Sequence, residues 1–559
     1  MIRCRTLLVI ALMLLSLTVA LAEFSSLASG NPTMFRDLFG EKAPNGIKIN
    51  SDGSVEGTDM IQANGNTYTL TGDLDVSITI LHDEVILDGN GHTLRGNSDQ
   101  IGVFLQGRNG VTIKNLAIEG FAYGIKLTWL DSPNEGGKTV TITGNVFSGN
   151  TNGIAFLEHM AGSNISDNYF TGNTYAVSNP TNITFRGNHF IDNDYCISDG
   201  NDLNDVDTSN TVDNKPVYYW INQQDKVVPS NAGWVALKNC KNITVQGLNL
   251  NRSGDGLALY NTVSSTIKSN VIANNAYGIS LHNSNGNAIV ENKIVGSKNY
   301  GIYLTSSSNN SIARNQINED SEGVRIEYGY NNTINQNEIT ANSLAGLFAS
   351  TLHANNVTDI TLVSQNIISK NGIGVWVYGG SSLTIVLNNI TDNLDWGMKL
   401  ESSQKDNIIH HNNFVDNNVT EKLQVCITGF WNQTFDGGKI NGTYRRPQQE
   451  FVAGMANVWD NGMEGNYWSD YTTRYSNATE IGKTGVGDTP FYINENNIDS
   501  HPLTAPVDIS NTNLLSPNQE PSGSDTPQNP FLSLTVLLAI ASVAIVGIGL
   551  AVFFKKRRN

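Results

Sequence analysis

The sequence predicts an all-β protein built as a parallel β-helix, and three observations support this fold class. A phrase of glycine, an apolar residue, any residue and a second apolar residue recurs along the chain. Its copies lie about 22 to 23 residues apart, a period typical of solenoids. Asparagines recur with a similar spacing, and no amphipathic helical pattern of useful length occurs between residues 60 and 420.

The recurring phrase has the alternation of a short strand. In one copy Ile302 and Leu304 flank Tyr303, so the two apolar side chains face one side of the strand and the tyrosine faces the other. Further short apolar stretches lie between the copies, which predicts three strands per coil and coils stacked about 4.8 Å apart. The copies begin at Gly124, Gly153, Gly256, Gly278, Gly301, Gly323, Gly346, Gly374 and Gly397.

The regularly spaced asparagines are predicted to stack in a column where each coil turns a corner. Asparagine tolerates the left-handed backbone of a turn, and stacked amides can satisfy one another and the turn backbone. Because buried polar groups are nearly always hydrogen-bonded, we interpret this column as structural, with a polar binding stripe as the alternative. The predicted members are Asn270, Asn292, Asn315, Asn337, Asn366, Asn389 and Asn412.

The charge balance limits the kinds of partner that the chain can have. The 559 residues include 34 lysines and arginines against 51 aspartates and glutamates, and few basic residues cluster before the C-terminal end. Nucleic acid is therefore excluded as an expected partner. An acidic surface rich in asparagine and threonine fits an exterior protein.

Both ends of the chain carry targeting patterns. Arg3, Arg5, an apolar stretch and a small-residue site before Glu23 predict a secretory signal, whose cleavage the sequence does not fix. Residues 531–554 are apolar and long enough to span a bilayer, and the basic residues after them predict a short cytoplasmic tail below an extracellular ectodomain. We divide the chain into a signal peptide (1–22), an N-terminal cap (23–61), β-helix coils (62–445) with an irregular excursion (199–233), an aromatic capping module (446–505), a linker (506–530), a transmembrane helix (531–554) and a tail (555–559).

Three cysteines lie beyond the signal segment, and we interpret them as unpaired thiols. Cys196 occupies the glycine position of its coil, whereas Cys240 falls on a turn, so the geometry disfavours a disulfide between them. Cys426 then has no natural partner.

The motifs along the chain resemble those of NosD-like β-helix surface proteins of the archaeal type, also called carbohydrate-binding and sugar-hydrolysis (CASH) repeats. The resemblance covers roughly residues 60 to 505 and implies a right-handed parallel β-helix. It rests on the entry stretch 85–94, the stretches 216–222 and 235–237, and the closing motifs at 465–471, 487–490 and 499–503.

The founding name of this family implies copper delivery to a periplasmic oxidoreductase. Copper requires clustered methionine, cysteine or histidine ligands. His410 and His411 are the one close histidine pair, and adjacent strand residues are expected to point to opposite faces. Met160, Met398 and Met455 are scattered, so the sequence disfavours copper maturation, which stays the third alternative.

β-Helices also host pectate lyases, polygalacturonases and uronate epimerases, so an enzyme is the second alternative. The polygalacturonase-like Asp-Asp pair, the Gly-His-Gly motif and the epimerase-like Asp-Pro-His-Asp motif are all absent from this chain. The excursion is rich in aspartate, whose oxygens suit calcium, although a solvated acidic loop is the favoured interpretation. The calcium candidates are Asp202, Asp205, Asp207 and Asp213.

The register of the phrase predicts an exposed stripe of aromatic and charged side chains. If the second and fourth residues of each copy face the core, the third and fifth face outward. Aromatic rings stack on sugar rings while arginine and glutamate bind hydroxyls or carboxylates, so the stripe suits a polysaccharide; cross-strand stabilisation of the sheet is the alternative. The ligand-binding candidates are Tyr260, His282, Tyr303, Arg325, Glu327, Phe348, Trp376, Tyr378, Lys399 and Glu401.

The sequence therefore predicts a non-catalytic protein of the cell surface that binds a polysaccharide or has a structural role. Its expected partners are a glycan, the membrane through the C-terminal segment, and surface-layer or envelope proteins. No cofactor is expected, with calcium as the one candidate ion. Arg325, Glu327, His282 and Lys399 are weak catalytic candidates. His282 and Glu327 lie two coils apart, about 10 Å, which is too far for one direct proton transfer.

Overall fold

The computed structural model describes residues 46–511, with gaps at 129–138, 158–159, 199–202, 351–359, 380–382, 402–406, 419–423, 429, 435–438, 441–442, 445–447 and 453–455. The predicted signal peptide, transmembrane helix and tail, most of the predicted linker, and Asp202 lie outside the described residues. Within the described part of the chain, no helix has the length and apolar character needed to cross a bilayer.

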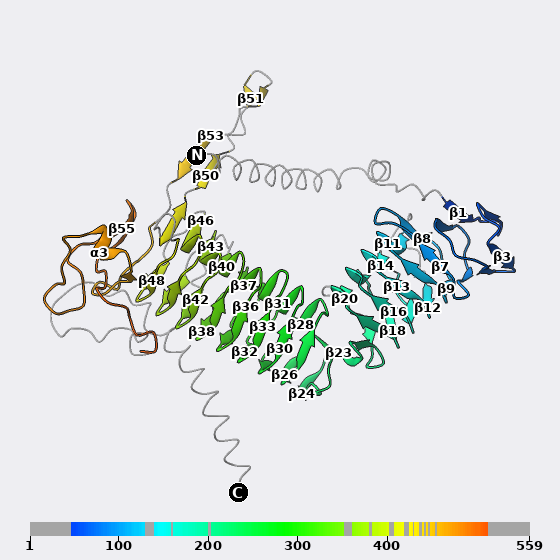
Figure 1. The fold of residues 1–559 in the computed structure, drawn as a ribbon, viewed down its shortest axis with the longest axis horizontal. Coiled ribbons are helices and arrows are strands. Elements are labelled where there is room, and N and C mark those ends of the chain that lie inside the picture. The colour runs from blue at the N-terminus through cyan, green and yellow to red at the C-terminus, as the bar shows by residue number, and fades with distance from the viewer. Residues whose placement is uncertain are drawn as a thin grey trace, which may run out of the picture.

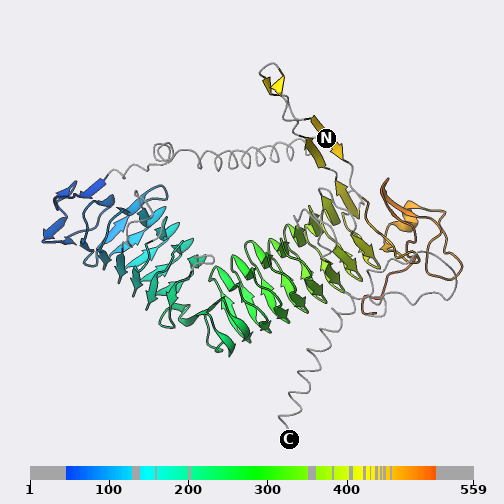
Figure 2. The same ribbon diagram turned by 180° about the vertical axis from the view of Figure 1, so that it is seen from behind.

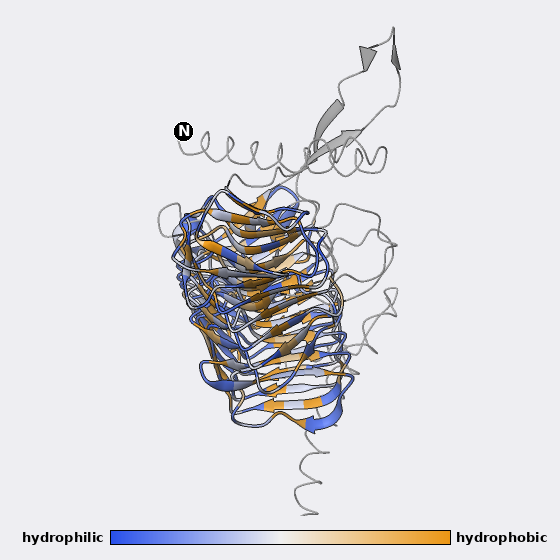
Figure 3. Ribbon diagram, turned by 90° about the vertical axis from the view of Figure 1, so that its right-hand side faces the viewer, coloured by the Kyte–Doolittle hydropathy of each residue, from blue (hydrophilic) through white to orange (hydrophobic). Residues whose placement is uncertain are grey.

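The described chain forms two solenoid arms that meet at an elbow, followed by a capping module (Figures 1 and 2). The N-terminal arm runs from β1 to β22 and the C-terminal arm from β23 to β49. Strands of successive coils pair in parallel along each face of an arm, as the phrase and its period predicted. Apolar strand residues alternate with polar corners along the whole body (Figure 3).

The N-terminal arm has three faces. The phrase of this arm lies on sheet A, where Ile125 pairs with Ile154 and Leu127 with Phe156. Strand β1 already pairs in parallel with β5, so regular sheet begins at the first described residues. Sheet A contains β1 (Gly46–Ile49), β2 (Val55–Glu56), β5 (Ser77–Ile80), β8 (Ile101–Gln106), β11 (Tyr123–Thr128), β14 (Asn152–Phe156), β17 (Tyr175–Ser178) and β20 (Tyr195–Ser198). Sheet B contains β3 (Ile61–Asn64), β4 (Thr67–Leu70), β6 (Ile86–Asp88), β9 (Val111–Lys114), β12 (Val140–Thr143), β15 (Asn164–Ser166), β18 (Thr184–Arg186) and β21 (Asp205–Val206).

The third face of the N-terminal arm continues into the C-terminal arm as one 16-stranded shared sheet. Its N-terminal strands are β7 (Thr93–Arg95), β10 (Ala117–Glu119), β13 (Val146–Ser148), β16 (Tyr169–Thr171), β19 (His189–Ile191) and β22 (Thr211–Val212). Its C-terminal strands are β23 (Lys215–Ile221), β25 (Trp234–Lys238), β28 (Asp255–Tyr260), β31 (Tyr277–His282), β34 (Tyr300–Thr305), β37 (Glu322–Glu327), β40 (Ala345–Ser350), β43 (Ile373–Tyr378), β46 (Trp396–Glu401) and β49 (Val425–Thr428). In the C-terminal arm the phrase lies on this sheet, so it changes face at the elbow.

The elbow arises because the chain reverses direction within the shared sheet. Strands β22 and β23 pair antiparallel, whereas all other neighbours in this sheet pair in parallel. Alternate residues of β23 and β25 then pack into different cores. Trp234 and Ala236 face the core of the N-terminal arm, and Val235 and Leu237 face that of the C-terminal arm. The two cores therefore lie on opposite sides of these two strands.

Sheets C and D complete the C-terminal arm. Sheet C contains β24 (Gln224–Val227), β26 (Lys241–Gln246), β29 (Thr266–Lys268), β32 (Ala288–Val290), β35 (Ser311–Ala313), β38 (Thr333–Asn335), β41 (Thr361–Ser364), β44 (Leu383–Val386) and β47 (Ile408–His410). Sheet D contains β27 (Asn249–Asn251), β30 (Val271–Ala273), β33 (Lys293–Val295), β36 (Gln316–Asn318), β39 (Glu338–Thr340), β42 (Ile367–Ser369), β45 (Asn389–Thr391), β48 (Asn413–Val415) and β54 (Tyr467–Trp468).

The buried asparagine column forms a directed hydrogen-bond ladder at the corner between sheets C and D. Asn292 donates from both its backbone nitrogen (2.9 Å) and its Nδ2 (3.0 Å) to Oδ1 of Asn315. Asn315 repeats the pattern one coil further on and also donates Nδ2 to the carbonyl of Ile289, at 2.9 Å. The predicted column was wrong at one position, because Asn388 is the buried member and Asn389 opens the next strand.

The ladder ends in the capping module, which spans residues 456–511. Asn412 donates to Asn466, and the Asn466 backbone nitrogen donates to Oδ2 of Asp499 at 2.8 Å. Trp468 also donates to this oxygen and packs its ring between Phe414 and Phe491, with centroids 4.6 and 4.2 Å away. The remaining elements are α3 (Tyr471–Arg474) and the hairpin strands β50 (Phe430–Thr434), β51 (Lys439–Ile440), β52 (Thr443–Tyr444), β53 (Gln448–Val452), β55 (Phe491–Asn494) and β56 (Asn497–Asp499).

Candidate functional site

The outward-facing side chains of β28, β31, β34, β37, β40, β43 and β46 form a continuous surface that we call the outer ladder. Parallel pairing aligns Tyr303, Arg325, Phe348, Trp376 and Lys399 one coil apart. This is the register that the sequence predicted for the third residue of the phrase. Two further rows flank it. One runs through Tyr277, Tyr300, Glu322, Ala345, Ile373 and Trp396, and the other through His282, Thr305, Glu327, Ser350, Tyr378 and Glu401.

Arg325 is the centre of the outer ladder. Its Nη1 lies 2.8 Å from Oε1 of Glu322, and its Nη2 lies 2.6 Å from Oε1 of Glu327. The guanidinium also lies across two rings, with Cζ 4.9 Å from the centroid of Tyr300 and 4.1 Å from that of Phe348. Tyr303 donates its hydroxyl to Oε2 of Glu327 at 2.7 Å. Both carboxylates are thus held by this cluster.

A second cationic cluster lies at the far end of the outer ladder. Lys399 Nζ contacts Oε2 of Glu401 at 2.7 Å and lies 4.5 Å from the ring centroid of Trp376. Trp376 donates its indole nitrogen to the same carboxylate oxygen at 3.0 Å. The ammonium, the ring and the carboxylate therefore restrain one another. Tyr378 is paired with Glu401 across strands β43 and β46 and has 39% of its surface exposed.

The elbow end of the outer ladder buries a third cation. Lys238 is completely buried, with Nζ 4.9 Å from the centroid of Tyr219 and 4.7 Å from that of Tyr260. The Tyr260 ring stacks on His282 at 4.6 Å. Burial, with a smaller contribution from the nearby Lys238 charge, lowers the pKa of His282 to about 4. His282 is consequently neutral at physiological pH.

Tyrosines from both arms gather at the elbow. Tyr175 and Tyr195 of sheet A stack at 4.6 Å, and Asn299 donates Nδ2 to the Tyr195 hydroxyl at 3.4 Å. Burial is the main cause that raises the pKa of both Tyr195 and Tyr277, and the nearby Asp255 carboxylate adds to it. The outer ladder therefore begins beside the elbow, where the end of sheet A lies next to the first strands of the C-terminal arm (Figure 1).

The outer ladder is less exposed than the sequence predicted. Phe348 and Tyr260 are buried, and the side chains of Arg325 and Lys399 are only 19% and 16% exposed. The physical reason is that each cation lies flat across neighbouring rings instead of extending into water, which removes both partners from solvent. Tyr378 is the most exposed of the predicted binding residues.

Sequence reasoning missed residues that complete the outer ladder. Glu322, Tyr300 and Tyr277 precede the glycine of their phrase copies, and Asp255 takes the same position beside the elbow. The position before the glycine was the signal that could have identified them, because its side chain also faces outward. Asp255 accepts a hydrogen bond from the buried hydroxyl of Ser280 at 2.7 Å.

The chemistry of the outer ladder suits recognition better than proton transfer. Glu327, the one central carboxylate among the predicted catalytic residues, already binds Arg325 and Tyr303. His282 lies two coils from it, through the pairs with Thr305. What remains available is the exposed ring of Tyr378 together with the partly exposed edges of the other rings and polar groups of the ladder.

Two of the predicted calcium-binding aspartates, Asp205 and Asp207, are paired with Arg186 in the structure. Asp205 forms an ion pair with Arg186, and Oδ2 of Asp207 lies 3.2 Å from its Nε. Burial, with the nearby Asp192 charge, raises the pKa of Asp213. Among the described residues, no group of three or more histidine, cysteine, aspartate or glutamate side chains is arranged to hold a metal ion.

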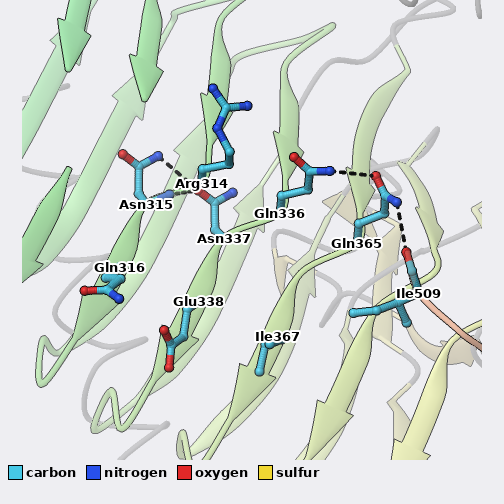
Figure 4. Close-up of a pocket in the computed structure, with 9 residues that line it drawn as sticks. All are labelled: Arg314, Asn315, Gln316, Gln336, Asn337, Glu338, Gln365, Ile367 and Ile509. Carbon is cyan, nitrogen blue, oxygen red and sulfur yellow. Dashed lines mark hydrogen bonds between the residues drawn. The ribbon is translucent and has the colours of Figure 1, made fainter. Parts of the chain in front are cut away.

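A polar cavity of about 330 Å³ lies on the corner between sheets C and D, away from the outer ladder (Figure 4). Ile509 closes one end of this cavity, because the last described residues of the capping module run back along the corner between sheets C and D. Asn413 pairs with the backbone of Val507 through two hydrogen bonds of 2.7 and 2.9 Å, and Gln365 donates to the carbonyl of Ile509 at 2.9 Å. The lining residues are Arg314, Asn315, Gln316, Gln336, Asn337, Glu338, Gln365, Ile367 and Ile509.

The fold and the outer ladder define a parallel β-helix protein whose phrase-bearing sheet carries a stacked aromatic and charged surface. The family described as periplasmic copper-binding protein (NosD) matches residues 50–231 and 220–362, and the description "right handed beta helix region" matches residues 356–444. These NosD matches cover more than half of the chain, which therefore belongs to the NosD family. No curated protein sequence matches the chain.

Several solved β-helices resemble the structure at low sequence identity. A periplasmic alginate epimerase, AlgG, is 14% identical, with a TM-score of 0.24 over 68% of this chain and 83% of its own. The A-module of a mannuronan C-5 epimerase from Azotobacter vinelandii is 14% identical, with a TM-score of 0.19 over 65% of this chain and 86% of its own. The Dettilon tailspike protein is 14% identical, with a TM-score of 0.24 over 63% and 57%. At these scores the likenesses carry no argument about function.

The copper implied by the family description does not fit the described residues. His410 and His411 face each other, contrary to our prediction, because His411 adopts a left-handed backbone (φ 55°) that turns its ring toward its neighbour. Their Nδ1 atoms lie 2.6 Å apart, a hydrogen-bond distance, whereas two nitrogens bound at about 2.0 Å to one tetrahedral ion lie about 3.3 Å apart. His411 Nε2 is engaged by Glu464 at 2.8 Å, and among the residues that the structure describes no third histidine or cysteine joins this pair in a metal-binding group.

Proposed function

We propose that this protein binds a glycan along the outer ladder and has no catalytic role there. One observation carries the proposal. Every coil from β31 to β46 places either an outward ring or, at β37, an arginine with two carboxylates on the phrase-bearing sheet, whereas a solenoid needs only small polar side chains on its outer surface. Coils about 4.8 Å apart match the scale of successive sugar units, and ring faces stack on the apolar faces of sugars.

We also propose that the protein is displayed on the outside of a membrane. The apolar residues 531–554, followed by the basic residues 555–558, support a single C-terminal anchor, and the N-terminal pattern supports secretion. Surface-layer or envelope proteins are natural neighbours in that location. An enzyme that modifies a polysaccharide remains the alternative, and the binding experiment below separates the two.

The test is retention of the full-length protein, kept in mild detergent, on immobilised polysaccharides. The variant carrying Trp376→Ala and Tyr378→Ala removes an indole and the exposed ring beside it, and we expect it to lose about tenfold or more in affinity. The matched control is Tyr169→Ala, since Tyr169 is an exposed ring (50%) on the N-terminal part of the shared sheet. The control should retain the glycan as the parent protein does.

Two outcomes contradict the proposal. If the double variant were retained as strongly as the parent protein, the outer ladder would not be the glycan-binding surface. Depolymerisation, or a changed sugar composition of the polymer recovered from the column, would show an enzyme instead. Circular dichroism of both variants verifies that the β-helix is intact.

A further inference from the structure

The two cations of the outer ladder are each paired with carboxylates of the same surface, and the lysine on the adjacent strand β25 is buried. Arg325 binds two carboxylates, Glu322 and Glu327, and Lys399 binds Glu401. Lys238 is completely buried between two tyrosine rings. Among the described strand residues of this surface, no further lysine or arginine faces outward.

The carboxylates of the same surface outnumber its cations. The outer ladder carries four carboxylates, on Asp255, Glu322, Glu327 and Glu401, against the two cations Arg325 and Lys399. The whole chain has a formal net charge of −17. A polyanion approaching this surface therefore meets a repulsive field at long range and no available cation at short range.

This arrangement selects among glycans by charge. A polyuronate places a carboxylate on every sugar and needs outward-facing arginine or lysine to pair with it. Here Arg325 and Lys399 would first have to leave carboxylates that lie 2.6 to 2.8 Å away. An uncharged sugar makes no such demand, because ring faces stack on it and carboxylate and phenol oxygens accept hydrogen bonds from its hydroxyls.

We infer that the outer ladder takes an uncharged polysaccharide and rejects polyuronates. This inference rests on the proposed glycan binding and specifies its substrate class. It distinguishes this chain from a binder of acidic polymers, which would present its cations outward.

The experiment compares retention of the full-length protein on neutral and uronate polymers. The neutral probes are mixed-linkage β-glucan, galactomannan and xylan, and the acidic probes are alginate and polygalacturonate, each at about 20 mM and about 300 mM salt. We expect retention by at least one neutral polymer, unchanged by salt, and none by the acidic polymers. Uronate retention that weakens with salt overturns the charge inference but keeps glycan binding. Retention by no polymer overturns the proposed function itself.

A charge variant tests the inference in the opposite direction. Glu401→Gln releases Lys399 but keeps a side-chain oxygen for the Trp376 indole, so it should acquire alginate retention at low salt, about tenfold above the parent protein. The matched control is Glu119→Gln, which changes net charge equally at the exposed Arg95 pair in the N-terminal arm. Should the first variant misfold, Glu327→Gln is the second variant, because it removes one of the two carboxylates that neutralise Arg325 and leaves only Glu322.

The control decides how a gain is interpreted. Alginate retention by Glu401→Gln alone supports neutralised cations as the cause of selectivity. Equal gains in Glu401→Gln and Glu119→Gln would reflect net charge only, and no gain in a folded Glu401→Gln or Glu327→Gln would show that the cations do not govern selectivity. Either of these two results overturns the inference.

Discussion

The two arms have the same architecture but differ in what fills the core and what faces outward. The N-terminal arm stacks phenylalanines, with Phe170 4.8 Å from Phe147 and 5.1 Å from Phe190, whereas the C-terminal arm stacks isoleucines such as Ile312. The third residue of the phrase in sheet A is small near the elbow, as at Ala155 and Ser178, although the stacked Tyr175 and Tyr195 also face outward there. The equivalent positions of the C-terminal arm carry the outer ladder.

This difference shows that core filling and surface chemistry vary independently in a β-helix. Both arms keep the buried asparagine columns, with Asn168 donating to Asn188 just as Asn292 donates to Asn315. A coil therefore needs its inward residues and its corner amides, while its outward residues are available for binding. The elbow adds a second constraint, because β23 and β25 serve both cores.

Core truncation in each arm should give the largest effects and tests whether the arms unfold together. Phe170→Ala should cost about 4 kcal/mol and Ile312→Ala about 3 kcal/mol of unfolding free energy, through lost burial and the cavities left behind. Because β23 and β25 contribute to both cores, we expect both variants to lower one common transition in denaturant, followed by circular dichroism. Two transitions, each sensitive to only one variant, would show that the arms unfold independently.

Removing the central arginine should have the next largest effect. Arg325→Ala leaves the buried Glu322 beside Glu327 without a cation, at a cost of about 3 kcal/mol. The control is Arg95→Ala in the N-terminal arm, whose ion pairs with Asp73 and Glu119 are exposed; we expect no measurable shift there. If chemical denaturation showed equal losses of unfolding free energy for Arg325→Ala and Arg95→Ala, the difference that we draw between the buried and the exposed ion pairs would be wrong.

A single aspartate in a second buried column, at the corner between sheet D and the shared sheet, should give a smaller and pH-dependent effect. Burial raises the pKa of Asp320 to about 7, above the ordinary value of 3.8. The folded state therefore binds the proton more tightly than the unfolded state, so the parent protein gains stability as pH falls from about 7 to about 4. Asp320→Asn should be more stable than the parent by about 2 kcal/mol at pH 8, with the difference vanishing near pH 4.

Thermal unfolding across this pH range measures the effect of Asp320→Asn. Asp392→Asn, at an exposed corner, is the control and should leave the parent's pH profile unchanged. A constant difference between Asp320→Asn and the parent at all pH values would rule out titration of Asp320 as its cause.

Most of the coil architecture could be predicted from the sequence because one residue period determines it. The alternation around Tyr303 gave the register of the outer ladder correctly, since a strand residue has only two directions to face. The column position at Asn389 was wrong by one residue, because two adjacent asparagines satisfy the spacing equally well.

The exposure of the outer ladder and the elbow could not be predicted in this way. Whether Arg325 extends into water or lies across Phe348 depends on side chains from neighbouring coils, which spacing alone does not place. The change of face at the elbow depends on the antiparallel pairing of β22 and β23, which the irregular excursion conceals. The contact between His410 and His411 was missed because the left-handed turn at His411 breaks strand alternation.

The hydrogen bonds between the asparagines of the ladder all run in one direction, toward the capping module, and Asp499 is the acceptor that ends the ladder. Each asparagine donates two hydrogen bonds to the asparagine of the next coil, so the last asparagine of the ladder needs an acceptor beyond it. A carboxylate can receive donors but has none to pass on, and Asp499 accepts from Asn466, Trp468 and His501. Whole coils can therefore be gained or lost upstream of the cap without redesigning either end, which makes the length of this solenoid a quantity that changes in units of one coil.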